Sequence, residues 1–223
     1  GHLALTNHTT GDKNTAVGRS AGASITTGVK NTVVGAFAMD NTTTGGSNTA
    51  LGRSALSANT TASNNTAVGD AALAANTTGD QSVSIGSNSL DANTTGRINV
   101  AVGHNALSSN TTADGNVAVG QSSLELNTTG ASNTGIGRAS LANNSTASNN
   151  TGVGYHSLLA NTTGAFNTAI GSRCLDANTT ASYNTAVGDQ AMTVNTTGSQ
   201  NVAVGNFALH LNNSSYNNAF GYS

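Results

Sequence analysis

Residues 65–81 read NTAVGDAALAANTTGDQ, and this stretch is one copy of a unit that fills a chain of 223 residues. The unit follows the pattern N-T-A-V-G-x-x-A-L-x-x-N-T-T-G-x-x. A fixed period of this kind predicts a stack of small, nearly identical structural units. The first glycine of the unit recurs every seventeen residues from Gly1 to Gly205, and the last member of the series, Gly221, comes one residue early. The members between Gly1 and Gly221 are Gly18, Gly35, Gly52, Gly69, Gly86, Gly103, Gly120, Gly137, Gly154, Gly171, Gly188 and Gly205.

The unit is too short and too rich in turn residues for a helical repeat. Glycine and the Asn-Thr-Thr-Gly segment interrupt helices and favour turns. The short T-A-V and A-L runs are bounded by turn residues, as strands are. We therefore expect an all-β protein, a parallel β-solenoid or β-roll of about thirteen seventeen-residue coils, with two short strands and two turns in each coil.

Two apolar positions recur in nearly every coil and are expected to form the core, with Met39 and Met192 substituting for the usual leucine. One directly precedes the glycine, as at Val68 and Ile85, and the other lies four residues after it, as at Leu73 and Leu90. A small residue such as Ala106 precedes the leucine position. We expect both aliphatic columns to lie inside the solenoid.

Adjacent apolar pairs, such as Ala67-Val68 and Ala72-Leu73, suggest self-association. Neighbouring side chains of a strand point to opposite faces, so one member of each pair would face outward. Such an exposed column marks an interface, and the small residues at positions such as Ala106 would allow close approach of a partner. We therefore expect a homotrimer, a closed symmetric solution. A monomer that buries both members in a tightly curved coil is the alternative.

The repeated string NTAVGxxALxxNTTG resembles repeats of bacteriophage tail-fibre and related surface-fibre proteins. Its N-[TS]-[AV]-[VI]-G core is also similar to the head repeats of trimeric autotransporter adhesins. Those heads are left-handed parallel β-rolls wound as homotrimers, with shorter repeats than this one. The resemblance covers residues 1–221 and implies a homotrimeric fibre, with an extracellular, cell-surface or virion location. The chaperone domain and the membrane anchor of these families are absent from the sequence.

Composition excludes several classes of partner. Only 7% of the residues are charged and the formal net charge is −2, whereas nucleic-acid binding needs clustered Lys and Arg. No apolar run approaches the roughly 20 residues of a membrane span. We therefore expect no nucleic-acid partner and no membrane insertion of this segment. The expected partner is the chain itself, with end-to-end joining into a filament and binding to surface glycans as further modes.

One polar pattern suggests modification. Asparagine followed two residues later by threonine is the N-x-[ST] glycosylation motif. Stacked hydrogen-bonding turns explain the same residues without any sugar. We expect outward turns and treat glycosylation as an open hypothesis at nine positions, Asn59, Asn76, Asn93, Asn110, Asn127, Asn144, Asn161, Asn178 and Asn195.

No catalytic residues, metal ligands or cofactor site are predicted. Cys174 occupies the small-residue position before a leucine and is expected to be a buried apolar side chain. The histidines lie at several different positions of the repeat, so we interpret them as surface residues: His2, His8, His104, His156 and His210. The sequence contains no phosphate-binding loop and no zinc or calcium motif.

Four functions rank in the following order. A structural, non-enzymatic fibre or shaft comes first, because nearly identical coils encode length. An adhesin or a receptor-binding tail-fibre module comes second, with aromatic residues such as Phe37, Tyr155 and Phe207 meeting glycans. Ice binding is third, since the neighbours Thr60 and Thr61 cannot both line one strand face. An enzyme is last.

We interpret residues 1–223 as one repeat domain and as a segment of a longer protein. Residues 209–223 form an atypical terminal coil, because Leu209 and Gly221 are one residue closer together than in other coils. Atypical end repeats often cap a stack. We expect Phe220 to plug the core and Tyr216 to cover its edge.

Overall fold

The computed structural model describes residues 1–222, whose regular secondary structure consists of thirteen β-strands of three residues each, with no helix. The all-β parallel solenoid with seventeen-residue coils is thereby confirmed. The strands are β1 (Thr15–Val17), β2 (Thr32–Val34), β3 (Thr49–Leu51), β4 (Thr66–Val68), β5 (Val83–Ile85), β6 (Val100–Val102), β7 (Val117–Val119), β8 (Thr134–Ile136), β9 (Thr151–Val153), β10 (Thr168–Ile170), β11 (Thr185–Val187), β12 (Val202–Val204) and β13 (Asn218–Phe220).

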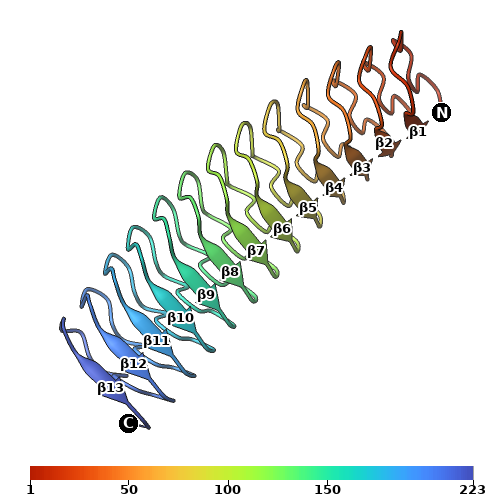
Figure 1. Ribbon diagram of the computed structural model, residues 1–223. Coiled ribbons are helices and arrows are strands. Elements are labelled where there is room, and N and C mark those ends of the chain that lie inside the picture. The colour runs from red at the N-terminus through yellow and green to blue at the C-terminus, as the bar shows by residue number, and fades with distance from the viewer. Residues whose placement is uncertain (223) are drawn as a thin grey trace. The chain divides into compact units, whose positions relative to one another are not determined.

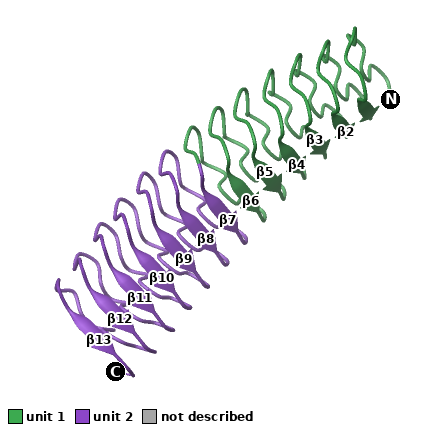
Figure 2. Cartoon of the chain, in the orientation of Figure 1, with its two compact units in different colours: residues 1–114 green, residues 115–223 purple. Residues whose placement is uncertain are grey.

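The chain divides into two compact units, residues 1–114 with β1–β6 and residues 115–223 with β7–β13 (Figure 2). Within each unit, strands that follow one another in the chain lie side by side (Figure 1) and pair in parallel. The register places Val68 opposite Ile85, seventeen residues later. Each unit is thus a stack of coils, and residues at one position of successive coils form a ladder.

Each coil contains one strand, so the expected second strand is wrong. The Ala-Leu segment is a series of turns in which the leucine has a left-handed backbone, with φ of 54° at Leu73 and 53° at Leu107. A left-handed residue breaks the alternation of an extended strand. Ala72 and Leu73 therefore both point into the coil, and both are completely buried.

The core combines the leucine ladder with the middle residue of each strand. Leu73 and Leu90 are fully buried, as expected. The aliphatic residue before the glycine is not in the core: Ala67 is fully buried, while its neighbour Val68 is only partly covered. The prediction of an internal valine ladder is wrong because, in a three-residue strand, only the middle side chain points inward.

Backbone conformation and close packing against the next coil both require glycine at the position after each strand. Gly69 has φ of 137°, which side chains of L-residues rarely adopt, and a Cβ there would lie 2.5 Å from the carbonyl oxygen of Gly86. The amide of Gly69 donates to the carbonyl of Leu51 at 2.8 Å. The glycine therefore allows successive coils to approach closely immediately after each strand.

Two ladders of buried asparagine hold the turns together. Before the strand, the Asn48 amide donates to Oδ1 of Asn31 at 2.9 Å, and Nδ2 of Asn48 donates to the carbonyl of Ala62 at 2.9 Å. In the Asn-Thr-Thr turn, Nδ2 of Asn93 donates to Oδ1 of Asn76 and to the carbonyl of Gly96, each at 3.0 Å. These side chains satisfy buried backbone groups that the short strands leave unpaired.

The last coil keeps the strand ladder with a shortened register. Val202 pairs with Asn218, sixteen residues later, and Val204 pairs with Phe220. Phe220 and Tyr216 are each 77% exposed. The expectation that Phe220 plugs the core and Tyr216 covers its edge is therefore wrong: Phe220 is the third residue of its strand and points outward, and Tyr216 lies exposed in the turn before that strand.

Candidate functional site

The outer face of each unit is formed by the first and third residues of its strands. The first residues are threonine, valine or asparagine, and the third residues are valine, isoleucine, leucine or phenylalanine. Neighbouring strands are about 4.8 Å apart, and residues two apart along a strand are roughly 6.6 Å apart. The outer face is therefore a regular, uncharged array that repeats in every coil.

Large apolar side chains are concentrated on and beside this outer face. Of the sixteen exposed large apolar residues among residues 1–222, six are third residues of strands, namely Val17, Leu51, Ile85, Ile136, Ile170 and Phe220. Four more belong to a second ladder, which we call the corner column, at the turn that precedes the strand: Ile98, Phe166, Tyr183 and Tyr216. Clustering of this kind differs from singly scattered apolar residues and is typical of an interaction surface.

The corner column was not predicted from the sequence. Phe166 and Tyr183 come from consecutive coils, and their rings stack with centroids 5.1 Å apart and planes within 2°. The seventeen-residue spacing of these two aromatic residues is a signal that could have revealed the contact. Their stacking extends the apolar surface around the edge of the outer face in residues 115–222.

The alanines before the leucines do not belong to an exposed surface. Ala55, Ala72 and Ala106 are completely buried within their own coils. The expectation that positions such as Ala106 face a partner is therefore wrong. Of the two apolar pairs in each coil, only the strand pair turns a side chain outward.

The nine asparagines proposed for glycosylation lie inside the coils, and not on outward turns as expected. Each is fully buried, with no exposed side-chain surface: Asn59, Asn76, Asn93, Asn110, Asn127, Asn144, Asn161, Asn178 and Asn195. Nδ2 of Asn144, for example, donates to Oδ1 of Asn127 at 2.8 Å and to the carbonyl of Ala147 at 2.9 Å. A sugar on Nδ2 would break this ladder, so the folded coil does not present these side chains as acceptors.

The two threonines of each turn have different environments. Thr60 is partly buried, and its Oγ1 donates to the carbonyl of Thr77 at 3.1 Å. Its neighbour Thr61 is exposed. One threonine of each turn thus supports the stack, while the other presents a hydroxyl group to solvent.

The residues considered for catalysis or metal binding are dispersed. Among residues 1–222 there is no group of three His, Cys, Asp or Glu side chains that could hold a metal ion. Cys174 is buried as expected, and burial raises the pKa of its thiol to about 12. Its Sγ lies 3.2 Å from the carbonyl oxygen of Ala186. A thiol with this pKa remains protonated and a poor nucleophile at neutral pH.

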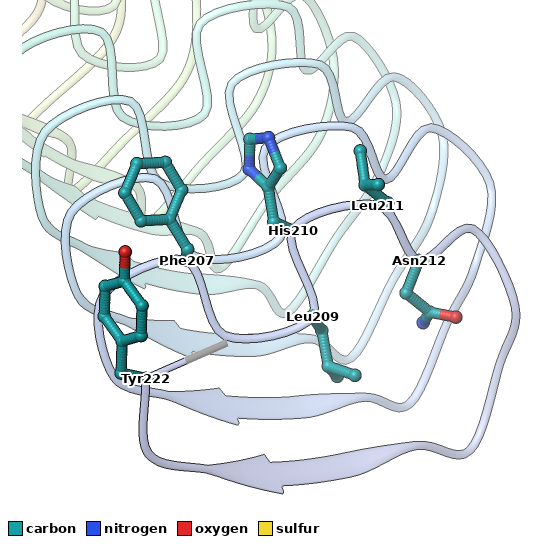
Figure 3. A pocket seen from close by; sticks show the side chains of 6 residues that line it. All are labelled: Phe207, Leu209, His210, Leu211, Asn212 and Tyr222. Atoms are coloured by element: carbon teal, nitrogen blue, oxygen red, sulfur yellow. The ribbon is translucent and has the colours of Figure 1, made fainter.

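A cavity of about 450 Å³ lies in the last coil and is lined by Phe207, Leu209, His210, Leu211, Asn212 and Tyr222. Figure 3 shows Phe207 and Tyr222 on one side of it and Leu211 and Asn212 on the other. Leu209 continues the leucine ladder and is only partly buried, since no later coil covers it within residues 1–222. The lining lacks the converging polar groups of a typical ligand site.

Charged side chains lie in the turns. In residues 1–114, Arg53 pairs with Asp70 of the next coil at 2.7 Å, and Arg97 lies 3.7 Å from Asp80. Beyond residue 114, Arg138 instead lies over the ring of Tyr155, with Cζ 5.7 Å from the ring centroid. These turn residues leave the outer face itself uncharged.

No helix among residues 1–222 is long and apolar enough to cross a membrane. Comparison with protein-family models, with curated proteins and with solved structures gave no match to this chain.

Proposed function

We propose that this chain is a structural, non-enzymatic segment of a fibre or shaft that assembles as a homotrimer outside the cell or on a virion. The observation that carries this proposal is the outer face, where an uncharged column of Val, Ile and Leu side chains repeats in every coil. Covering this column removes apolar surface from water.

A second copy of the chain is the partner that fits this face. The face repeats at the strand spacing of about 4.8 Å, and the same unit of another copy, aligned coil to coil, has the same spacing. The face carries no charge that would require an oppositely charged partner. Three copies closed around one axis would cover all three outer faces, as in the trimeric adhesin heads that the repeat resembles.

The construction of the coil also suits a structural role. A typical coil contributes one leucine or methionine, one strand and one side chain to each of the two asparagine ladders, and within each unit it hydrogen-bonds to its neighbouring coils. Stability in such proteins is close to a sum of repeat and nearest-neighbour terms. Adding coils therefore adds length without requiring a new core.

The experiment places arginine on the outer face. Ile136→Arg combined with Ile170→Arg puts two charges among side chains that the proposal buries, and an unpaired buried charge costs several kcal/mol. Thr163→Arg, on an exposed turn threonine, is the matched control. We expect the double variant to sediment as a folded monomer and the control to remain a trimer. An unchanged trimer in the double variant would show that this face is not the interface.

A glycan-binding module is the second candidate function. The observation in its favour is the position of Tyr155, which is 37% exposed and stacks on His156 with ring centroids 3.8 Å apart. Tyr155 follows the glycine after β9, so it lies beyond the outer face. A chain covered by two partners on its outer face would still present this ring to solvent.

A further inference from the structure

We propose that Arg138, Tyr155, His156 and Arg173 form a site for the oxyanion groups of an acidic saccharide, either carboxylates or sulfates. These four residues, which we call the arginine–tyrosine cluster, come from three consecutive coils. The inference deepens the second candidate function and is independent of the structural role.

The backbone brings the four residues together. The amide of His156 donates to the carbonyl of Arg138 at 3.1 Å, and the amide of Arg173 donates to the carbonyl of Tyr155 at 2.8 Å. The two arginines are therefore two coils apart, roughly 10 Å at the strand spacing of about 4.8 Å. Flexible side chains at this separation can hold two acidic groups of one polymer or converge on a single group.

Both arginines are available to a ligand. They are the only Lys or Arg residues after position 114, and both are exposed. Arg53 and Arg97 pair with carboxylates, whereas no carboxylate within residues 1–222 lies at ion-pair distance from Arg138 or Arg173. The planar guanidinium group donates two parallel hydrogen bonds to carboxylate, sulfate or phosphate oxygens.

The aromatic pair orders the cluster. The Tyr155 ring stacks on the His156 ring with planes within 16°, and Cζ of Arg138 lies over the Tyr155 ring at 5.7 Å from its centroid. Stacking restricts Arg138 before a ligand arrives, which reduces the entropy lost on binding. Burial, followed by the charges of Arg138 and Arg173, lowers the pKa of His156, while Asp176 opposes this shift. At neutral pH the arginines thus supply the positive charge, with Asp176 as the nearby carboxylate.

A saccharide fits this patch better than a nucleic acid. Nucleic-acid binding draws on many cations, whereas residues after position 114 provide two arginines against Glu125, Asp176 and Asp189. The surrounding turns are rich in hydroxyl and amide groups, including Ser172 and Gln190. Such a surface can exchange hydrogen bonds with sugar hydroxyls while two guanidiniums hold the acidic groups.

Titration calorimetry of the whole chain at about 0.15 M salt, where surface charges are partly screened, tests the site. The probes are polygalacturonate, dextran sulfate and neutral dextran, with polyglutamate and single-stranded DNA as competing polymers. We expect an acidic saccharide to bind, and the tighter of the first two identifies carboxylate or sulfate. Arg138→Ala and Arg173→Ala should each weaken binding by about tenfold, the loss expected for a charge-assisted hydrogen bond.

Arg53→Ala and Arg97→Ala are the controls, because they remove exposed arginines outside the cluster, and both should bind within about twofold of the unaltered chain. The affinity of Arg138→Lys for the acidic saccharide should lie between those of the unaltered chain and Arg138→Ala.

Equal losses of affinity in the controls, equal binding of neutral dextran, or tighter binding of polyglutamate or DNA would overturn the proposal. Circular dichroism confirms that each variant is folded. Sedimentation of the same samples reports self-association, so failure of this site would be distinguishable from failure of the structural role.

Discussion

Gly69→Ala tests whether the left-handed backbone after each strand determines the glycine period. Gly69 has φ of 137°, and a Cβ would lie 2.5 Å from the oxygen and 2.6 Å from the carbonyl carbon of Gly86. Holding alanine at a sparsely populated φ costs about 1–3 kcal/mol. If the backbone shifts instead, the Gly69-to-Leu51 hydrogen bond of 2.8 Å is weakened, at about 1 kcal/mol. We expect a total loss of roughly 2–4 kcal/mol in the free energy of unfolding.

Gly28→Ala is the matched control for this experiment. A Cβ at Gly28 would also lie 2.5 Å from a carbonyl oxygen of the next coil, that of Gly45, but its φ lies outside the left-handed region. Alanine already occupies the equivalent position at Ala62 and Ala181. The backbone can therefore accommodate a methyl group there, and a compatible Gly-to-Ala change alters stability by no more than about 1 kcal/mol.

Equilibrium unfolding in urea, followed by circular dichroism, gives the two free-energy changes. A clear loss for Gly69→Ala beside a near-neutral Gly28→Ala would support the role of the backbone angle. If both variants lost equal stability, crowding and not the left-handed φ would decide where glycine is required. A near-neutral Gly69→Ala would refute the reasoning outright.

Four further predictions concern the interior of the coil. Leu90→Ala should cost about 2–5 kcal/mol of unfolding free energy in urea titration, because Leu90 is fully buried in the leucine ladder. Asn93→Ala should cost at least about 2 kcal/mol in the same assay by leaving Oδ1 of Asn76 and the carbonyl of Gly96 without their donor, whereas exposed Thr95→Ala should be nearly neutral. Cys174, whose pKa is raised to about 12, should react with iodoacetamide only after unfolding; mass spectrometry of native samples showing rapid labelling would contradict this. Burial raises the pKa of Asp91, so the folded chain binds this proton more tightly than the unfolded chain. Its ionised form therefore lowers stability above the folded pKa, and this loss is relieved as the pH falls. Asp91→Asn should accordingly unfold at higher urea than the unaltered chain at neutral pH, with a smaller difference in acid.

The period and class of the fold could be predicted from the sequence because they depend on spacing alone. Gly69 and Gly86 recur with the same interval as Leu73 and Leu90, and only stacked coils of equal length place each pair in contact. The buried leucine ladder follows from the same argument. In both cases, one regular interval corresponds to one layer of the structure.

Which strand residue points into the core could not be predicted from the sequence, because the alternation of side chains specifies only that Ala67 and Val68 lie on opposite sides of the strand. The structure buries the smaller residue, Ala67, in the core and turns the larger one outward. The left-handed backbone conformation of Leu73 could not be predicted from the sequence either, since residues other than glycine rarely adopt it. Packing of the leucine side chain in the core selects this conformation against local preference.

The role of the asparagines in the Asn-Thr-Thr turns could not be predicted from the sequence either. The Asn76-Thr77-Thr78 pattern fits both a glycosylation motif and a hydrogen-bonded turn, and side-chain orientation decides between the two. The arginine–tyrosine cluster required the coil register as well, because Arg138 and Arg173 are 35 residues apart in the sequence.

The mass of the folded particle tests the central claim most directly. Native mass spectrometry of the unaltered chain at micromolar concentration should give one species of about 66 kDa, three times the chain mass of 21.9 kDa, because in the proposed trimer two further copies cover the uncharged apolar outer face. A single species at 21.9 kDa that persists as the concentration rises would contradict the claim that this face is a self-association surface.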